Sequence, residues 1–175
     1  MSKAEHITAN PLGWAYVCLA HHKSKEFDAF CKSAFDYPQS PIEAVFLSAL
    51  VEACTSHGVG WLDICGDDRI MVNSWSPDGI SITPQHKIGT YSADFVVGAT
   101  GAMAHEQAIP EIVVECDGHD FHSRTKEQAA HDRKRDRFMQ EEGFKVFRFT
   151  GSELWKDPPA CASQVLTMLG FSRDD

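Results

Sequence analysis

Five ionisable side chains stand within eight positions after a short apolar run. The segment EIVVECDGHDFH, residues 111–122, follows its Ile-Val-Val run with Glu115, Asp117, His119, Asp120 and His122. Carboxylates and imidazoles at the end of a buried strand cost free energy unless something compensates them. A bound cation would compensate them, so this segment is the first candidate for a functional site.

The spacing of the acids predicts where they point. Successive side chains of a strand point to opposite faces, so Glu115 and Asp117 share one face while Cys116 faces the core. Asp94 interrupts the apolar run YSADFVV in a similar way. If these strands are neighbours, three carboxylates converge, and two of them about 4 Å apart repel by roughly 4 kcal/mol at an effective dielectric near 20.

A divalent cation reverses the sign of this repulsion. Oxygen ligands suit Mg²⁺, which keeps several waters and completes its shell with substrate phosphate. Such a metal ion lowers the pKa of a bound water and stabilises charge that develops on a phosphoryl group. The acids therefore predict magnesium-dependent phosphodiester hydrolysis, with Mn²⁺ as a substitute.

Turn residues and periodicity predict the elements that position these acids. Residues 40–58 predict a helix with Ser40 as N-cap, Pro41 at the first helical position and Glu43 three residues after the cap. Short β-branched and aromatic runs from 61 to 117 predict an antiparallel meander.

The remaining segments predict helices around one more strand. A polar helix is expected over 123–142, a strand over 144–151 and a closing helix over 161–171, after Pro158-Pro159. Residues 12–35 predict one helix or two short ones. The order predicts a mixed α/β sheet flanked by helices in one domain, 1–175, with an N-terminal helical extension (1–36) and a core at 40–170.

Composition limits the class of protein. The chain has 175 residues and is 43% hydrophobic, which suits one globular domain. No apolar run approaches the roughly 20 residues that span a bilayer, and the first residues lack the apolar centre of a signal peptide, so a cytoplasmic location without membrane contact is expected. The net charge of −9 argues against nucleic-acid binding, but residues 124–148 hold eight basic and five acidic side chains.

Three segments together resemble one known superfamily. YSADFVV, IVVECDGHDFH and DRKRDRFMQEEGFKVFRFTGSEL resemble the restriction-endonuclease-like PD-(D/E)xK nucleases, and within them small stand-alone domains related to very-short-patch mismatch-repair endonucleases. The resemblance is specific over about residues 90–155, extends with weaker motifs back to Ser40 and is absent from the first 35 residues.

The resemblance implies an αβββαβ core that hydrolyses DNA. It implies that Asp94 and Glu115 bind magnesium with the carbonyl of Cys116, and that water attacks a DNA phosphodiester. Many relatives carry lysine two residues after the glutamate, where this chain has Asp117. Asp117 therefore either joins the metal shell or leaves the role of the lysine to another group, for which His122 is the first candidate.

Basic side chains supply candidates for DNA contact. Lys126 is the second candidate for the role of the lysine. Arg133 and Arg137 share a helix face and could bind phosphate, and Arg148 could point towards the site. Each has a simpler interpretation as a solvated charge. Glu43 likewise is either part of a capping box or an acid that approaches the metal.

The leading hypothesis is a magnesium-dependent DNA endonuclease or nickase. An alternative is a degenerate nuclease fold kept as a nucleic-acid-binding or regulatory module, and a third is a hydrolase of nucleotides or small phosphate esters. Cutting both strands of a duplex usually takes two sites, so a homodimer belongs to the leading hypothesis. Strand preference and sequence specificity do not follow from the sequence.

Overall fold

The computed structural model describes residues 37–64, 68–72, 76–118 and 125–172. The expected N-terminal helical segment and His122 lie outside these ranges. The elements are, in chain order, α4 (Pro41–Ser56), β1 (Trp61–Ile64), β2 (Asp68–Met71), β3 (Asp78–Ile88), β4 (Tyr91–Gly101), α5 (Ala102–Gln107), β5 (Ile112–Asp117), α6 (Lys126–Glu141), β6 (Lys145–Thr150), α7 (Gly151–Lys156) and α8 (Pro158–Met168).

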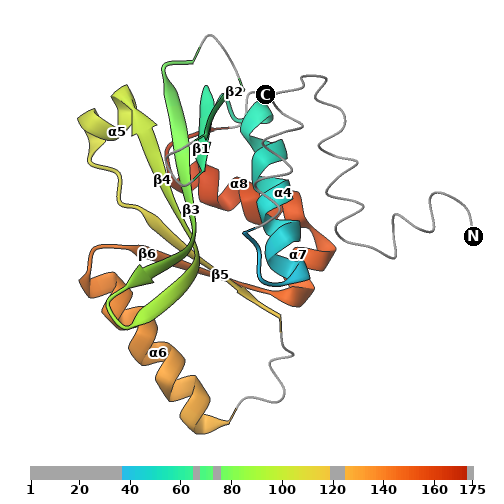
Figure 1. Ribbon diagram of the computed structural model, residues 1–175, viewed down its shortest axis with the longest axis vertical. Helices are drawn as coiled ribbons and strands as arrows, with labels where there is room; N and C mark the ends of the chain where they lie inside the picture. The colour runs from blue at the N-terminus through green and yellow to red at the C-terminus, as the bar shows by residue number, and fades with distance from the viewer. Residues whose placement is uncertain (1–36, 65–67, 73–75, 119–124, 173–175) are drawn as a thin grey trace, which may run out of the picture.

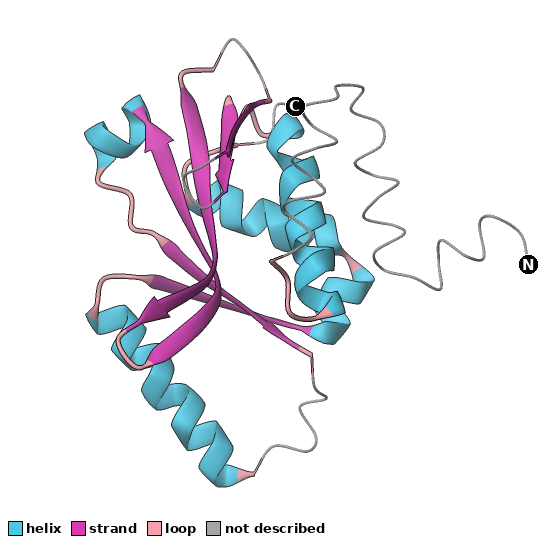
Figure 2. Ribbon diagram, in the orientation of Figure 1, coloured by secondary structure: helices cyan, strands magenta, loops and turns pink. Residues whose placement is uncertain are grey.

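The strands form a six-stranded sheet in the order β2-β1-β3-β4-β5-β6 (Figure 2). Pairs β1–β2, β3–β4 and β4–β5 are antiparallel, whereas β1–β3 and β5–β6 are parallel. Helices α4 and α8 lie on one side of the sheet and α6 on the other (Figure 1). The mixed α/β class and the restriction-endonuclease-like arrangement of a sheet flanked by helices are confirmed.

The antiparallel meander is confirmed only from β3 to β5. Strand β2 folds back along the outer edge of β1, so β3 can pair only with the other edge of β1, and it does so in parallel.

Two short helices were not expected: α5 forms in a segment that looked like a loop, and α7 follows β6 directly. Helix α8 begins at Pro158 itself, because Asp157 caps it and the first turn of a helix needs no proline N–H.

Strand β3 continues through a proline. Its ladder with β1 ends at the pair Ile64–Ile82, so Pro84, which has no N–H to donate, lies beyond that ladder. The next residue, Gln85, has a φ of 50°. The ladder with β4 passes from Pro84–Phe95 to His86–Ala93, which places Gln85 beside Asp94 without a ladder pair.

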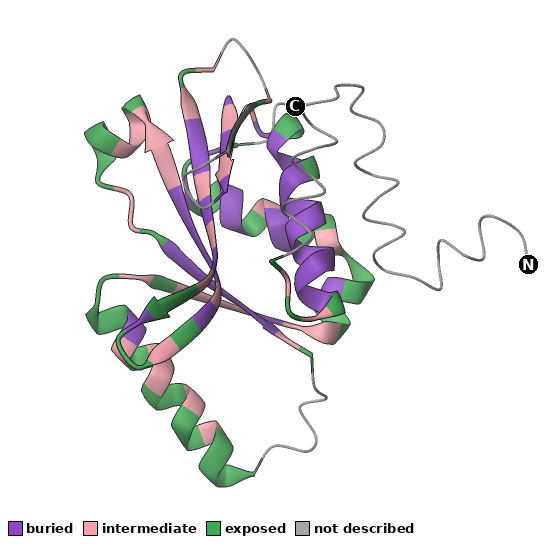
Figure 3. Ribbon diagram, viewed as in Figure 1, coloured by how far each residue is buried: buried purple, intermediate pink, exposed green. Residues whose placement is uncertain are grey.

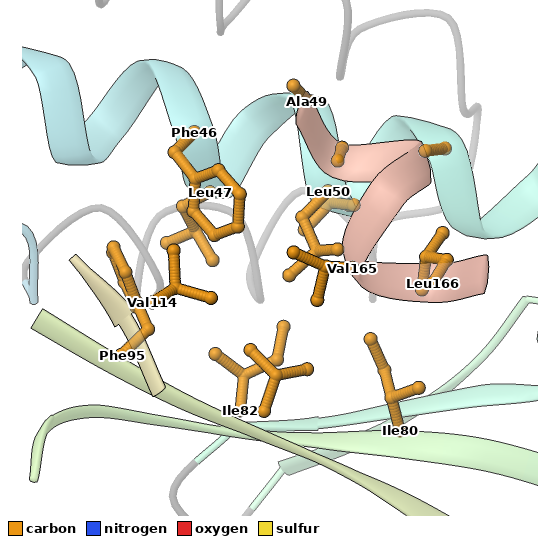
Figure 4. Close-up of a cluster of buried hydrophobic side chains, with 14 of the residues drawn as sticks. Phe46, Leu47, Ala49, Leu50, Ile80, Ile82, Phe95, Val114, Val165 and Leu166 are labelled. Atoms are coloured by element: carbon orange, nitrogen blue, oxygen red, sulfur yellow. The ribbon is translucent and has the colours of Figure 1, made fainter. Parts of the chain in front are cut away.

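The main core lies between the sheet and helices α4 and α8 (Figure 4). The ring of Phe46 on α4 has its centroid 5.6 Å from that of Phe95 on β4 and 5.8 Å from that of Phe149 on β6. This aromatic contact joins α4 to the two strands beside β5. Figure 3 shows α4 mostly buried and α6 mostly exposed.

Helix α6 covers the second face of the sheet through a smaller cluster. Its fully buried residue is Met139, which packs with Val96 and Val113, while Phe138 is half-buried. Thr125 caps the helix in a reciprocal capping box with Gln128. The sequence predicted this polar helix and both apolar contacts at its C-terminal end.

Candidate active site

Strand β5 presents its acids to the face that α6 covers. Val114 and Cys116 belong to the main core, as expected, and Glu115 and Asp117 alternate with them. Arg148 on β6 is the register partner of Glu115. The acids at the end of β5 therefore lie beside β6 and beneath α6.

Asp94 is attached to β5 by a hydrogen bond. The backbone N–H of Cys116 donates to Oδ2 of Asp94 over 2.7 Å. Burial raises the pKa of Asp94 above its ordinary value of 3.8, and the charges of Glu43 and Asp117 add to the rise, against the opposing effect of the N–H donor. The bond thus holds a carboxylate that is costly to ionise next to Glu115.

Glu115 is the most deeply buried acid of this group, at 4% exposure. Its Oε2 accepts a hydrogen bond of 3.0 Å from Nη2 of Arg135 on α6. Burial raises the pKa of Glu115 from 4.5 to about 7, in opposition to Arg135. Oε1 is also buried, and no donor among the described residues bonds to it.

Asp117 faces a cation on the neighbouring strand. Nη1 of Arg148 lies 3.2 Å from Oδ1 and 3.4 Å from Oδ2 of Asp117. Nη2 of the same arginine donates to Oδ1 of Asp136 on α6 over 2.6 Å. Burial would lower the pKa of Arg148, but the two aspartates raise it above its ordinary value, so the guanidinium stays charged and joins β5, β6 and α6.

Glu43 is buried at the start of α4 and is engaged as a cap. Its carboxylate accepts from the backbone N–H of Gln39 at 2.8 Å, from Ser40 Oγ at 2.7 Å and from Nε2 of Gln85 at 3.0 Å. Ser40 Oγ in turn accepts from the N–H of Glu43. The predicted capping role is confirmed, with Gln39 rather than Ser40 supplying the N–H, while a role in the reaction stays a prediction.

The basic candidates expected on helix α6 lie on its outer surface. Lys126, Arg133 and Arg137 are exposed on α6, so the described contacts do not bring them to the carboxylates. The arginine that reaches Glu115 is Arg135. The sequence pattern did not select it, because that pattern pairs Arg133 with Arg137 as the arginines that share a helix face. A signal was present: Arg135 precedes the buried Met139 by four residues and so lies on the inward face of the helix.

The described side chains alone do not make up a cluster of metal ligands. Within the described ranges, no three His, Cys, Asp or Glu side chains form a group that could hold a metal ion. Glu115 and Asp117 each turn an oxygen towards an arginine. Burial raises the pKa of the Cys116 thiol, which keeps it protonated and leaves its carbonyl as the ligand that the residue could offer.

A family model decides the relationship of the chain. The model REase_MTES_1575, a restriction-endonuclease-like family, matches residues 69–169, more than half of the sequence. The chain belongs to this family. The matched part of this restriction-endonuclease-like chain runs from β2 to α8 and includes Asp94, Glu115 and Asp117, whereas Glu43 precedes it.

Membership in a restriction-endonuclease-like family indicates a nuclease, and such nucleases generally use divalent metal ions. Comparisons with curated proteins and with solved structures gave no match. None of the helices in the described ranges is long and apolar enough to cross a bilayer.

Proposed function

We propose that the protein is a magnesium-dependent DNA endonuclease or nickase in which Asp94 and Glu115 hold the metal ion. The observation that carries this proposal is Oε1 of Glu115, a buried carboxylate oxygen without a donor among the described residues. An unpaired buried oxygen on a carboxylate costs free energy. A divalent cation would offset that cost.

The donor set fits magnesium. Glu115 Oε1, the Asp94 carboxylate and the Cys116 carbonyl are hard oxygen ligands, the type that Mg²⁺ prefers. When bound, the ion would activate water and stabilise charge on the phosphoryl group. Asp117, paired with Arg148, would stay outside the shell or reach it through water.

The chain itself positions these ligands. The Cys116 N–H orients Asp94, and Arg135 orients Glu115. Because these contacts come from β5 and α6, the ligands are held by regular elements rather than by loops. His122 and Lys126 stay the proposed candidates for accepting the proton of the attacking water.

The test compares wild type with Glu115→Gln on supercoiled plasmid, linear duplex and single-stranded DNA. With MgCl₂ we expect wild type to nick or cut at least one of these and to stop when EDTA is added, while Glu115→Gln is inactive but folded. Glu111→Gln, an exposed acid just before β5, is the matched control and should keep its activity. Intact DNA with all three substrates, together with no binding of Mg²⁺ or Mn²⁺, would contradict the proposal.

The alternative is a degenerate nuclease fold that binds nucleic acid or regulates a partner. It is supported by Asp117, where many relatives of the superfamily carry lysine, and by the arginines that already neutralise two of the acids. This alternative fails if Glu115→Gln removes a metal-dependent cleavage without unfolding the protein.

A further inference from the structure

Arg135 reaches the acids of the site from the inward face of α6. Its Nη2 binds Glu115, and its charge acts on both Glu115 and Asp94. The side chain keeps 20% of its surface exposed. We propose that Arg135 holds Glu115 with Nη2 and donates its other terminal nitrogen, Nη1, to a phosphate oxygen of the nucleic acid.

The terminal nitrogens distinguish Arg135 from Arg148. A guanidinium has five N–H donors in a fixed plane. Arg148 uses both of its terminal nitrogens on carboxylates, one on Asp117 and one on Asp136. Arg135 uses Nη2 alone within the described residues, so its Nη1 is not engaged there, whereas the Nε of each arginine is buried without an acceptor.

A partly buried guanidinium with an unengaged terminal nitrogen has lost part of its hydration without gaining a partner there. A phosphate oxygen would supply the acceptor, with the planar, charge-assisted geometry that arginine forms with phosphate. The ligand would also need this cation, because the acids Asp94, Glu115 and Asp117 repel a phosphodiester. Arg148 could offer a terminal nitrogen only by breaking its ion pair with Asp117 or with Asp136.

This inference rests on the proposed function, so its test has one arm that needs cleavage and one that does not. The first arm measures kcat and Mn²⁺ affinity for Arg135→Met and Arg135→Lys. Lys134→Met removes a neighbouring exposed cation of the same helix and is the control. We expect Arg135→Met to lower kcat about 100-fold or more, as for loss of one preorganised donor, with Arg135→Lys between it and wild type.

Mn²⁺ affinity separates phosphate contact from a purely structural role. Arg135→Met should bind Mn²⁺ as tightly as wild type or more tightly, because it removes a competing cation from Glu115. A kcat equal to that of Lys134→Met overturns the inference. So does a loss of Mn²⁺ binding as complete as in Glu115→Gln, since the arginine would then act through Glu115 alone.

The second arm is an NMR titration of the ¹⁵N-labelled protein with thymidine 3′,5′-bisphosphate and CaCl₂. The Arg135 Nε–H signal is identified by its absence from the Arg135→Lys spectrum. We expect it to shift on titration, and a signal that stays in place overturns the inference. If wild type cleaves nothing and binds no metal, the proposed function fails, while this arm still decides whether Arg135 contacts phosphate.

Discussion

The backbone N–H of Cys116 donates to Oδ2 of Asp94 over 2.7 Å, so the carboxylate of one strand is fixed to the backbone of the next. The regular ladder between β4 and β5 ends at the pair Phe95–Val114, two residues before Cys116 on β5 and one residue after Asp94 on β4. The side chain of Asp94 therefore takes over a backbone donor where the two strands stop pairing. This bond sets the position of Asp94 relative to Glu115.

Asp94→Asn should stabilise the metal-free protein at pH 8. Burial raises the pKa of Asp94, so the charged form opposes folding, whereas the amide is neutral and its oxygen can still accept from Cys116. We expect the free energy of unfolding in EDTA to rise on the order of 1 kcal/mol, a common gain for a stabilising change, and Mn²⁺ binding to be lost. Urea unfolding measures the change in stability, with Glu142→Gln at an exposed position as the control. An Asp94→Asn protein that is less stable than wild type would contradict the prediction.

The metal-free protein should lose stability as the pH rises from 5 to 8. The pKa of Glu115 is about 7 in the folded protein, against an ordinary value of 4.5, so the folded state binds this proton more tightly than the unfolded state. The stability that comes from this difference is fully present below pH 4.5 and is lost as the pH rises through 7. At roughly 1.4 kcal/mol per pKa unit this amounts to about 3 kcal/mol. Unfolding in urea with EDTA should show wild type falling relative to Glu115→Gln over this range, and parallel curves would refute the assignment.

Arg148→Met should destabilise the fold. Removing the guanidinium leaves Asp117 and Asp136 without the cation that they share. We expect a loss of about 2–3 kcal/mol, below the value for fully buried pairs because Asp136 is partly exposed. Adding Asp136→Asn to Arg148→Met should recover part of the loss, whereas the control Lys134→Met should cost little. If Arg148→Met were as stable as wild type, the two ion pairs would contribute nothing to stability.

Ser40→Ala and Glu43→Gln separate the two interpretations of Glu43. The first removes the cap hydroxyl and should cost about 1 kcal/mol with no change in Mn²⁺ affinity. The second keeps an oxygen for the N–H of Gln39 and removes the charge, so as a cap substitution it should also leave Mn²⁺ affinity unchanged. Calorimetric titration that shows tenfold weaker Mn²⁺ binding in Glu43→Gln, about 1.4 kcal/mol, would instead assign Glu43 to the metal.

Much of the fold follows from local sequence signals. Ser40, Pro41 and the apolar positions after them predicted α4, and alternation along β5 predicted that Val114 and Cys116 are buried. The parallel pairing of β1 with β3 was missed, because strand order depends on which sheet edge is free after β2 has folded back. No residue pattern within β1 or β3 encodes that choice.

The site was predictable for its acids and less so for their partners. Two acids on one face of a buried strand mark Glu115 and Asp117 from spacing alone. Choosing among the arginines of α6 required knowing which face of the helix is inward, and this polar helix has a single fully buried residue, Met139. That one contact turns Arg135 towards the site and leaves Arg133 and Arg137 exposed.

Crystals grown with MnCl₂ and measured at the manganese absorption edge test the central claim most directly. The account predicts an anomalous peak in contact with Glu115 Oε1 and the Asp94 carboxylate, at about 2.0–2.2 Å from each, as expected for oxygen ligands of a small divalent ion. The same crystals of Glu115→Gln should lack the peak. Wild-type crystals without density between these two side chains, at Mn²⁺ concentrations that saturate related sites, would contradict the account.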